Sequence, residues 1–125
     1  MAIRIQRQRA AGWRLPENTL CVGRPSIWGN PWVGPDAVPA YKMFCEQVVE
    51  GVLSISLIEG AMQIRRVFSK PIDDWQQLRT EMFAYVKQPR DVACWCGLTQ
   101  ACHGNLIIAL PYLFAWHRAG SVVPK

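Results

Sequence analysis

Two short apolar segments, residues 19–23 and 92–96, constrain the fold of this chain most, because two amphipathic helical patterns lie between them. Each segment has the length and the flanking turn residues of a buried strand. Strands joined by helical crossovers pair in parallel with a right-handed connection. We therefore predict an α/β domain, Rossmann-like and two or three layers thick, with a short, mostly parallel sheet. The alternating residues 3–5 predict one further short edge strand.

Helical periodicity predicts three main helices. The first follows Asp36, which we expect to cap it, and the second covers residues 73–86. The third covers residues 105–116, where Pro111 either kinks the helix or starts its second half. The apolar residues within 53–70 follow no single helical or strand period. Apolar positions of the first two patterns are Val38, Tyr41, Phe44, Cys45, Val48, Val49 and Val52, then Trp75, Leu78, Met82, Tyr85 and Val86.

The chain of 125 residues is predicted to form a single domain over residues 1–125. Half of its residues are apolar and 18% are charged, which provides a core without disulfide bonds. The longest apolar stretch, residues 106–116, is shorter than the roughly 20 residues that span a bilayer, so we expect no membrane association. The first residues carry charge without an apolar run and do not resemble a secretory signal.

The number and spacing of the cysteines favour a reducing compartment. Five is an odd number, and a Cys-x-Cys pair suits free thiols or a metal better than a disulfide framework. We therefore expect a cytoplasmic protein. Because a short sheet leaves edges to be covered, we also expect a homodimer.

Positive charge is concentrated in the first 35 residues. Of the net charge of +5, this part carries +4, from five arginines against Glu17 alone. Such a field attracts phosphate groups, on nucleic acid or on a small nucleotide. A basic segment that only increases solubility is the alternative.

The segment after the first buried strand has three prolines and two glycines in twelve residues, which predicts an irregular loop. Its candidate ligand-binding residues are Arg24, Ser26, Trp28, Gly29 and Asn30. Arg24 can hold a phosphate or a carboxylate with two donors. Trp28 can stack on a base while Asn30 binds the edge of that base. In the alternative interpretation, the tryptophans of the loop pack against the core and Asn30 only satisfies backbone groups.

A second candidate segment carries Cys94, Cys96, Cys102 and His103 within ten residues. Thiols and imidazole are ligands of zinc and of iron–sulfur clusters. The spacing differs from the usual separated pairs, because Cys94 and Cys96 fall on one face of the predicted strand. A zinc ion on these four residues is one interpretation, and small buried cysteines in a core strand are the one we favour.

The Cys-His-Gly-Asn sequence before the third helix is typical of a helix start. Free amide groups and the positive end of the helix dipole bind anions there, so Gly104 and Asn105 are candidate phosphate ligands. The same field would activate Cys102 as a nucleophile beside His103, although no acidic partner for this histidine can be identified. A polar contact from His103 to a ligand, with Trp95 against the base, completes the candidate site.

The segments GWRLPENTLCVGRPSIWGNPW and ACWCGLTQACHGNLI together resemble the phage and bacterial domain-of-unknown-function family 4326. The resemblance covers most of the chain except residues 53–72, which look like a variable insert. It implies a small intracellular α/β protein, often phage-encoded, in a bacterial or phage-infected cell, with no established activity. The family pattern admits Asp where this chain has Asn105, and the amide counts against a catalytic carboxylate at that position.

The sequence favours a domain that binds or processes a small nucleotide or nucleoside-derived ligand. In a phage-like protein this means nucleotide metabolism, base modification or sequestration of a host signalling nucleotide, and the residues leave open whether the domain is an enzyme. The alternative is a nucleic-acid-binding protein with a metal-stabilised loop, and a plain interaction module is a third interpretation. The P-loop, dinucleotide-binding and zinc-protease signatures are absent from the sequence.

Overall fold

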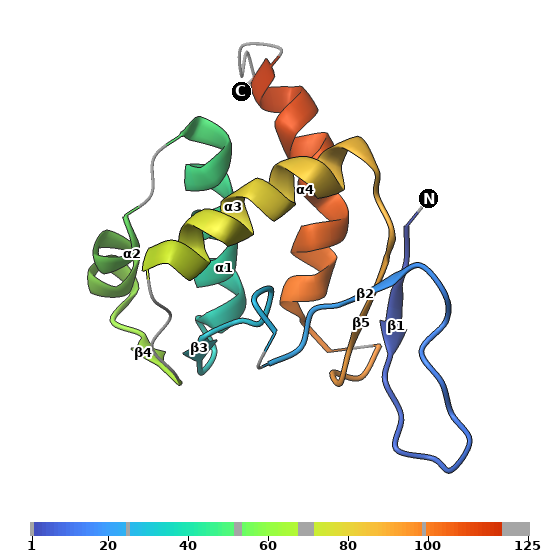
Figure 1. Cartoon of the computed structure of the whole chain (residues 1–125). Coiled ribbons are helices and arrows are strands. Elements are labelled where there is room, and N and C mark those ends of the chain that lie inside the picture. The colour runs from blue at the N-terminus through green and yellow to red at the C-terminus, as the bar shows by residue number, and fades with distance from the viewer. Residues whose placement is uncertain (1, 25, 52–53, 68–71, 99, 119–125) are drawn as a thin grey trace.

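The computed structural model describes residues 2–24, 26–51, 54–67, 72–98 and 100–118, which form a mixed α/β fold (Figure 1). One sheet has three strands and a second sheet has two. In chain order the elements are β1 Arg4–Gln6, β2 Thr19–Cys21, β3 Trp32–Val33, α1 Ala37–Glu50, α2 Ile55–Met62, β4 Arg65–Arg66, α3 Ile72–Lys87, β5 Asp91–Cys94 and α4 His103–Arg118.

Strand β5 lies between β1 and β2, and both neighbours run parallel to it, which confirms the predicted short parallel sheet. Val92 pairs with Arg4 on one side and with Leu20 on the other. The side chains of Val92 and Ala93 are fully buried, as expected for the central strand of a parallel sheet. In Figure 1 the sheet lies beside the helices, and the connection from β1 to β2 extends away from both.

Four helices, rather than the three predicted, are present in the described residues, because α2 occupies part of the segment that fitted no period. Helix α1 buries the face that its periodicity predicted, and Val52 lies outside the described residues. Asp36 is the N-cap residue of α1, as predicted, but its side chain makes no capping hydrogen bond. With φ −94° and ψ 4°, Asp36 is not in the extended conformation from which a capping carboxylate reaches the next amides. The buried residues of α1 are Ala40, Tyr41, Phe44, Cys45 and Val48.

Aromatic rings from the loop after β2 and from two helices form the centre of the core. The ring of Trp75 in α3 lies 5.8 Å from that of Trp32 and 4.7 Å from that of Phe44, measured between centroids. Trp32 belongs to β3, which pairs antiparallel with β4. An irregular, proline-rich loop is therefore held in one place by packing rather than by a regular backbone ladder.

Helix α4 begins at His103, two residues before the predicted start, and continues through Pro111 as one helix. It contacts α1, α3 and β5, and it buries Ile107 and Leu110 completely. The earlier start places His103 and Gly104 in the first turn, directly after Cys102. Among the described residues, no helix has the length and apolar character needed to cross a membrane.

Candidate functional site

A cavity of about 480 Å³ lies where β2 and β5 reach their carboxyl ends. The two strands are parallel neighbours, so the segments that follow them start close together. This is the edge at which open parallel sheets bind ligands. The cavity is lined by both candidate segments and by the start of α1, through Gly23, Arg24, Asn30, Trp32, Val33, Gly34, Ala37, Val38, Cys94, Trp95, Cys96, Ala101, Cys102 and His103.

The predicted site residues divide into two groups. Those that line the cavity are Arg24, Asn30, Cys94, Trp95, Cys96, Cys102 and His103. Those that do not line it are Ser26, Trp28, Gly29, Gly104 and Asn105. The structure thus brings most of the predicted site residues together in one cavity, and the remaining ones lie outside its lining.

Trp28 belongs to the core. Its side chain is 2% exposed, its ring packs edge-to-face on Tyr85, and its indole N–H donates to Glu81 across 3.0 Å. No face of the Trp28 ring is open to the cavity, so this residue does not fit the base-stacking role predicted for it.

Trp32, which the sequence analysis did not select, lines the cavity instead. It is fully buried, and its Nε1 atom has no hydrogen-bond partner among the described residues. An unpaired buried donor costs about 1–3 kcal/mol, so an acceptor in the cavity would stabilise this residue. Trp28 and Trp32 lie in the same irregular segment, where no period distinguishes a core residue from a cavity residue.

Asn30 and Gly29 shape the loop. The Asn30 side chain donates to the carbonyl of Ala37 and accepts the N–H of Trp32, at 2.9 and 3.0 Å. A Cβ atom on Gly29 would lie 3.0 Å from the Cα of Arg24 and from the carbonyl oxygen of Ser26. Both residues therefore have a structural role, the alternative that the sequence left open for Asn30.

Three thiols lie together in the lining of the cavity. The Sγ atoms of Cys94, Cys96 and Cys102 are all within 4.8 Å of one another, and those of Cys94 and Cys96 are 3.7 Å apart. Cys94 and Cys96 share one face of the β5 extension, as predicted. The loop after them returns and adds Cys102, which local spacing did not indicate. This group of ligand atoms could hold a metal ion.

Hydrogen bonding among the thiols changes their pKa values in opposite directions. Cys102 stabilises the ionised form of Cys94, which lowers the pKa of Cys94 to about 5. The pKa of Cys102 is raised because Cys102 is the donor to Cys94 and because it is buried. Burial also raises the pKa of Cys96. These directions favour a thiolate on Cys94 in the metal-free group and count against Cys102 as the activated nucleophile.

His103 connects the two segments. Its Nε2 atom is 2.7 Å from the carbonyl oxygen of Val22, and its Nδ1 atom is 4.0 Å from the Sγ of Cys102. Because a carbonyl only accepts, the proton of the neutral ring is on Nε2. Burial lowers the pKa of His103, and its ring packs at 4.8 Å from that of Tyr41.

The first amides of α4 are used within the turn. Gly104 donates its N–H to the Sγ of Cys102 at 3.4 Å, and Asn105 donates its N–H to the carbonyl of Cys102 at 3.1 Å. Neither residue lines the cavity. The phosphate-binding role predicted for this helix start is therefore better given to the arginines.

Arg4 organises the second segment, and the sequence analysis missed it. Its guanidinium donates to the carbonyls of Cys96, Gly97, Leu98 and Gln100 and to the side chain of Asn105, at 3.0 to 3.2 Å. These bonds join β1 to a loop more than 90 residues away in the chain. Only the pairing of β1 with β5 makes them possible, so no local pattern identifies Arg4.

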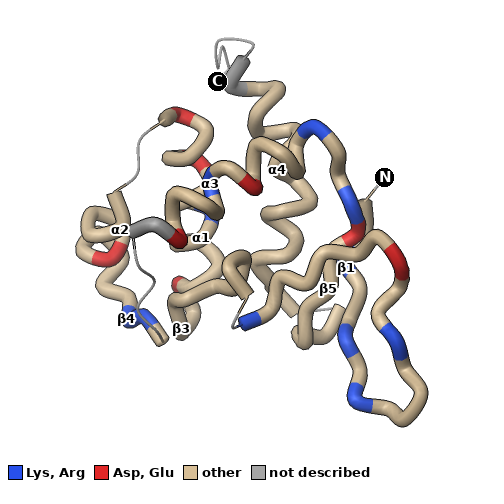
Figure 2. The backbone as a smooth tube through the Cα atoms, in the orientation of Figure 1, with Lys and Arg blue, Asp and Glu red and all other residues tan. Residues whose placement is uncertain are grey.

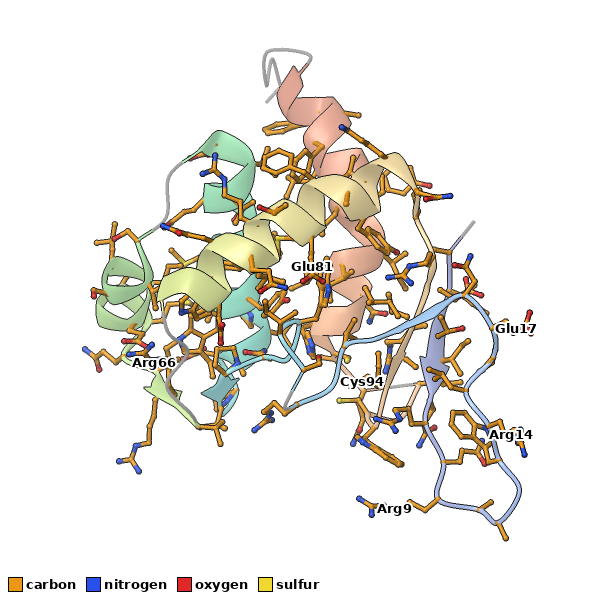
Figure 3. All side chains as sticks on the ribbon, viewed as in Figure 1. Arg9, Arg14, Glu17, Arg66, Glu81 and Cys94 are labelled. Atoms are coloured by element: carbon orange, nitrogen blue, oxygen red, sulfur yellow. The ribbon has the colours of Figure 1, made fainter. Side chains whose placement is uncertain are left out.

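Two further arginines lie near the cavity, stacked on Trp95, whose side chain is 38% exposed. The guanidinium carbons of Arg7 and Arg9 lie 4.5 and 4.6 Å from the centroid of the Trp95 ring. Both arginines come from the connection between β1 and β2, which carries several basic residues and projects from the molecule (Figure 2). Figure 3 places Arg9 and Arg14 on this projection.

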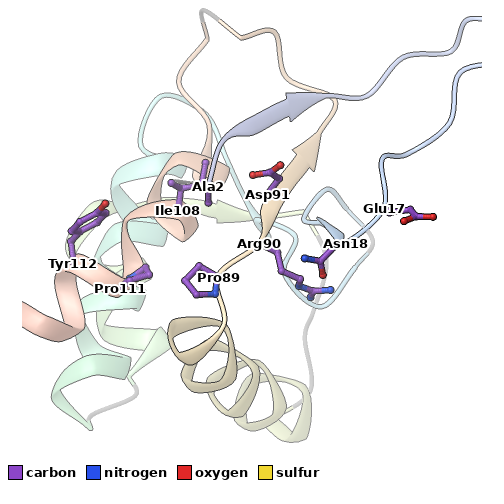
Figure 4. A pocket seen from close by; sticks show the side chains of 9 residues that line it. All are labelled: Ala2, Glu17, Asn18, Pro89, Arg90, Asp91, Ile108, Pro111 and Tyr112. Atoms are coloured by element: carbon purple, nitrogen blue, oxygen red, sulfur yellow. The ribbon is translucent and has the colours of Figure 1, made fainter.

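A second cavity, of about 450 Å³, lies at the opposite edge of the sheet. Its residues precede or begin the three parallel strands, as Ala2, Asn18 and Pro89 do, or belong to α4 (Figure 4). Glu17, Arg90 and Asp91 give it both signs of charge, and Asp91 already accepts the N–H of Ile3. None of the predicted site residues lines it.

The comparisons with known proteins gave one match. A family model described as "Domain of unknown function (DUF4326)" matches residues 5–111, a region that includes both candidate segments. No curated protein and no solved structure matches the chain significantly.

Proposed function

The chain belongs to the DUF4326 family of domains of unknown function, and on that premise we propose that the cavity between β2 and β5 binds a small phosphorylated ligand derived from a nucleotide. The observation that carries the proposal is the charge of the cavity. Arg24 lines it, and no Asp or Glu is among its described lining residues. Arg7 and Arg9 add positive charge where they stack on Trp95. An anionic group is the complement of such a lining.

The aromatic residues support a nucleoside attached to the phosphate. Trp95 lines the cavity and is partly exposed, and tryptophan stacks on bases of any type. Trp32 also lines the cavity, and we propose that the ligand supplies the acceptor that its buried indole N–H lacks among the described residues. We therefore assign the phosphate to Arg24 and the base to Trp95 and Trp32, with the base displacing one of the two guanidinium groups that lie over the Trp95 ring.

We propose binding rather than acid–base catalysis as the role of the cavity. A general base is most often a carboxylate or an accessible imidazole. The described lining residues contain no carboxylate, and His103 is buried with its Nε2 proton bonded to Val22. Sequestration or delivery of a nucleotide fits this lining.

Zn²⁺ is the ion that we propose for the group of three thiols. Thiolates are soft ligands and favour zinc over magnesium or calcium. The metal would fix the loop after β5, on which Trp95 lies. Elemental analysis of protein purified from zinc-supplemented cells tests this, and we expect one zinc per chain.

A second candidate function is nucleic-acid binding, and one observation favours it. The projecting connection between β1 and β2 carries Arg7, Arg9 and Arg14, of which Arg9 and Arg14 are exposed. Arginines on a projection can contact several phosphates of a strand at once. This function predicts an affinity that falls steeply with salt, whereas a cavity for one nucleotide predicts a shallow dependence.

Thermal-shift and calorimetric titration with nucleoside mono-, di- and triphosphates and cyclic nucleotides test the main proposal. We expect at least one class of nucleotide to increase the Tm. The increase should be lost in Arg24→Ala. It should be kept in Arg79→Ala, a control that removes the same charge on α3, outside the cavity. Trp32→Phe should weaken binding while Trp28→Phe should not. Retained binding in Arg24→Ala, or no shift with any nucleotide, would overturn the proposal.

A further inference from the structure

We infer that the thiol group holds its metal through three protein ligands only, so that one coordination position opens into the cavity and takes an exchangeable ligand. This inference rests on the zinc ion of the proposed function and adds a second binding element to the cavity, beside the arginines. The ligands of the metal can be measured without any nucleotide.

The spacing of the sulfur atoms agrees with a tetrahedral ion. Zinc–sulfur bonds of about 2.3 Å at tetrahedral angles place two sulfur atoms roughly 3.8 Å apart. The Sγ atoms of Cys94 and Cys96 are 3.7 Å apart, and Cys102 completes a group within 4.8 Å. Only small shifts of Cys102 would then be needed to form three bonds to one ion.

A fourth protein ligand is missing from the described residues. The atoms that lie within 4.8 Å of one another are the three thiols, without the imidazole of His103. The unprotonated Nδ1 atom of that ring lies 4.0 Å from the Sγ of Cys102 but is not within 4.8 Å of all three sulfur atoms. No Asp or Glu is among the described residues that line the cavity. Structural zinc sites use four protein ligands, whereas three protein ligands and a water are typical of sites that act on or bind other molecules.

The position of the cluster makes the open coordination site accessible. All three cysteines line the cavity that also contains Arg24 and Trp95. Cys96 is only half-buried, so solvent reaches the group from this side. Water would complete the coordination in the free protein, and a small anion entering the positively charged cavity would replace it.

Substitution with Co²⁺ tests the ligand set, because its visible bands respond to every change of ligand. We expect one Co²⁺ per chain, strong thiolate-to-cobalt charge transfer and tetrahedral bands. Titration with azide, and separately with inorganic phosphate, should shift these bands in a saturable way. A spectrum that neither anion changes would show a closed site and overturn the inference, as would less than one metal per chain.

Variants within the chain provide matched controls. Cys96→Ser and Cys102→Ser should each weaken the charge-transfer band by about the share of one thiolate, or lose the metal. Folding is checked by far-ultraviolet circular dichroism, and Cys21→Ser, outside the cluster, should keep the full band. His103→Gln should leave the cobalt bands unchanged, and a change of ligand number there would make His103 the fourth ligand and contradict the inference. Arg24→Ala should keep the metal and lose nucleotide binding, so failure of one proposal is separable from failure of the other.

Discussion

The Nε2 atom of His103 lies 2.7 Å from the carbonyl oxygen of Val22, and this bond ties the first turn of α4 to the chain just beyond β2. It joins two segments that are 81 residues apart. It also fixes the neutral tautomer and directs the unprotonated Nδ1 toward the side of Cys102. This bond adds to the pairing of β2 with β5 in holding the two walls of the cavity together.

Replacing His103 should show the contribution of this bond. A glutamine amide can donate to the Val22 carbonyl from nearly the same position, whereas alanine leaves that buried acceptor unpaired. We expect His103→Ala to lower the free energy of unfolding by about 2 kcal/mol more than His103→Gln, measured by urea denaturation. Equal losses in the two variants would show that packing, rather than the bond, is what His103 supplies.

The lowered pKa of His103 predicts how stability varies with pH. The unfolded chain binds a proton near the ordinary pKa of 6.5, and the folded chain binds it only at lower pH. The free energy of unfolding should therefore fall as the pH drops below 6.5, because protons then favour the unfolded state. Comparison of urea midpoints for wild type and His103→Gln checks this. A decline of the same size in the glutamine variant would assign it to other groups.

The metal-free protein should contain one thiolate near neutral pH. Its ultraviolet thiolate absorbance should disappear on acidification with a midpoint close to the pKa of about 5 that Cys102 imposes on Cys94. In Cys102→Ala the midpoint should rise toward the ordinary thiol value of 9.0. Cys45→Ala, which removes a buried thiol of α1, is the control and should leave the titration unchanged.

Arg4 should be needed to hold the loop after β5. Arg4→Met keeps much of the aliphatic stem but leaves several carbonyls of residues 96–100 without their charged donor. We expect a loss of about 2–3 kcal/mol in the free energy of unfolding, with faster amide exchange in this loop. Arg14→Met, an exposed position on the projecting connection, should change stability by less than about 0.5 kcal/mol. If the two variants behave alike, the loop is held by other contacts.

Glycine substitutions should have opposite effects at two positions. In Gly29→Ala the new methyl group meets backbone atoms at 3.0 Å, which should cost about 1–3 kcal/mol of unfolding free energy. In Gly60→Ala, within α2, nothing lies within 4 Å of the new methyl group, and stability should rise by about 0.5–1 kcal/mol. Chemical denaturation of both variants tests the pair, and a neutral Gly29→Ala would contradict the close approach in the loop.

Much of the architecture follows from the sequence because periodicity is local. The apolar segments 19–23 and 92–96 predict paired parallel strands, and the structure pairs β2 with β5 in parallel. The predicted buried face of α1 is also confirmed. The edge of the sheet where both candidate segments begin followed from the same topology. Strand Arg4–Gln6 was also expected, with a shift of one residue.

The details of the site depend on contacts that no local pattern encodes. The sequence does not distinguish Trp28 from Trp32, because both are tryptophans of one irregular segment. In the structure Trp28 packs on Tyr85 and Trp32 packs on Trp75, and only Trp32 lines the cavity. The return of Cys102 to Cys94 depends on a loop that Arg4 holds from the far end of the chain. Spacing alone therefore argued against a cluster that the tertiary structure forms.

The central place of β5 also determines the order in which the sheet can form during synthesis. Strands β1 and β2 leave the ribosome first, yet neither can pair with the other because β5 lies between them. Both must persist as unpaired edges through the translation of three helices, and the native contacts that finally form are of high contact order. Insertion of β5 completes the sheet, and the loop and helix that follow it then bring Cys102 and His103 to the cavity. The nascent chain therefore holds no complete site until the residues beyond β5 have been made.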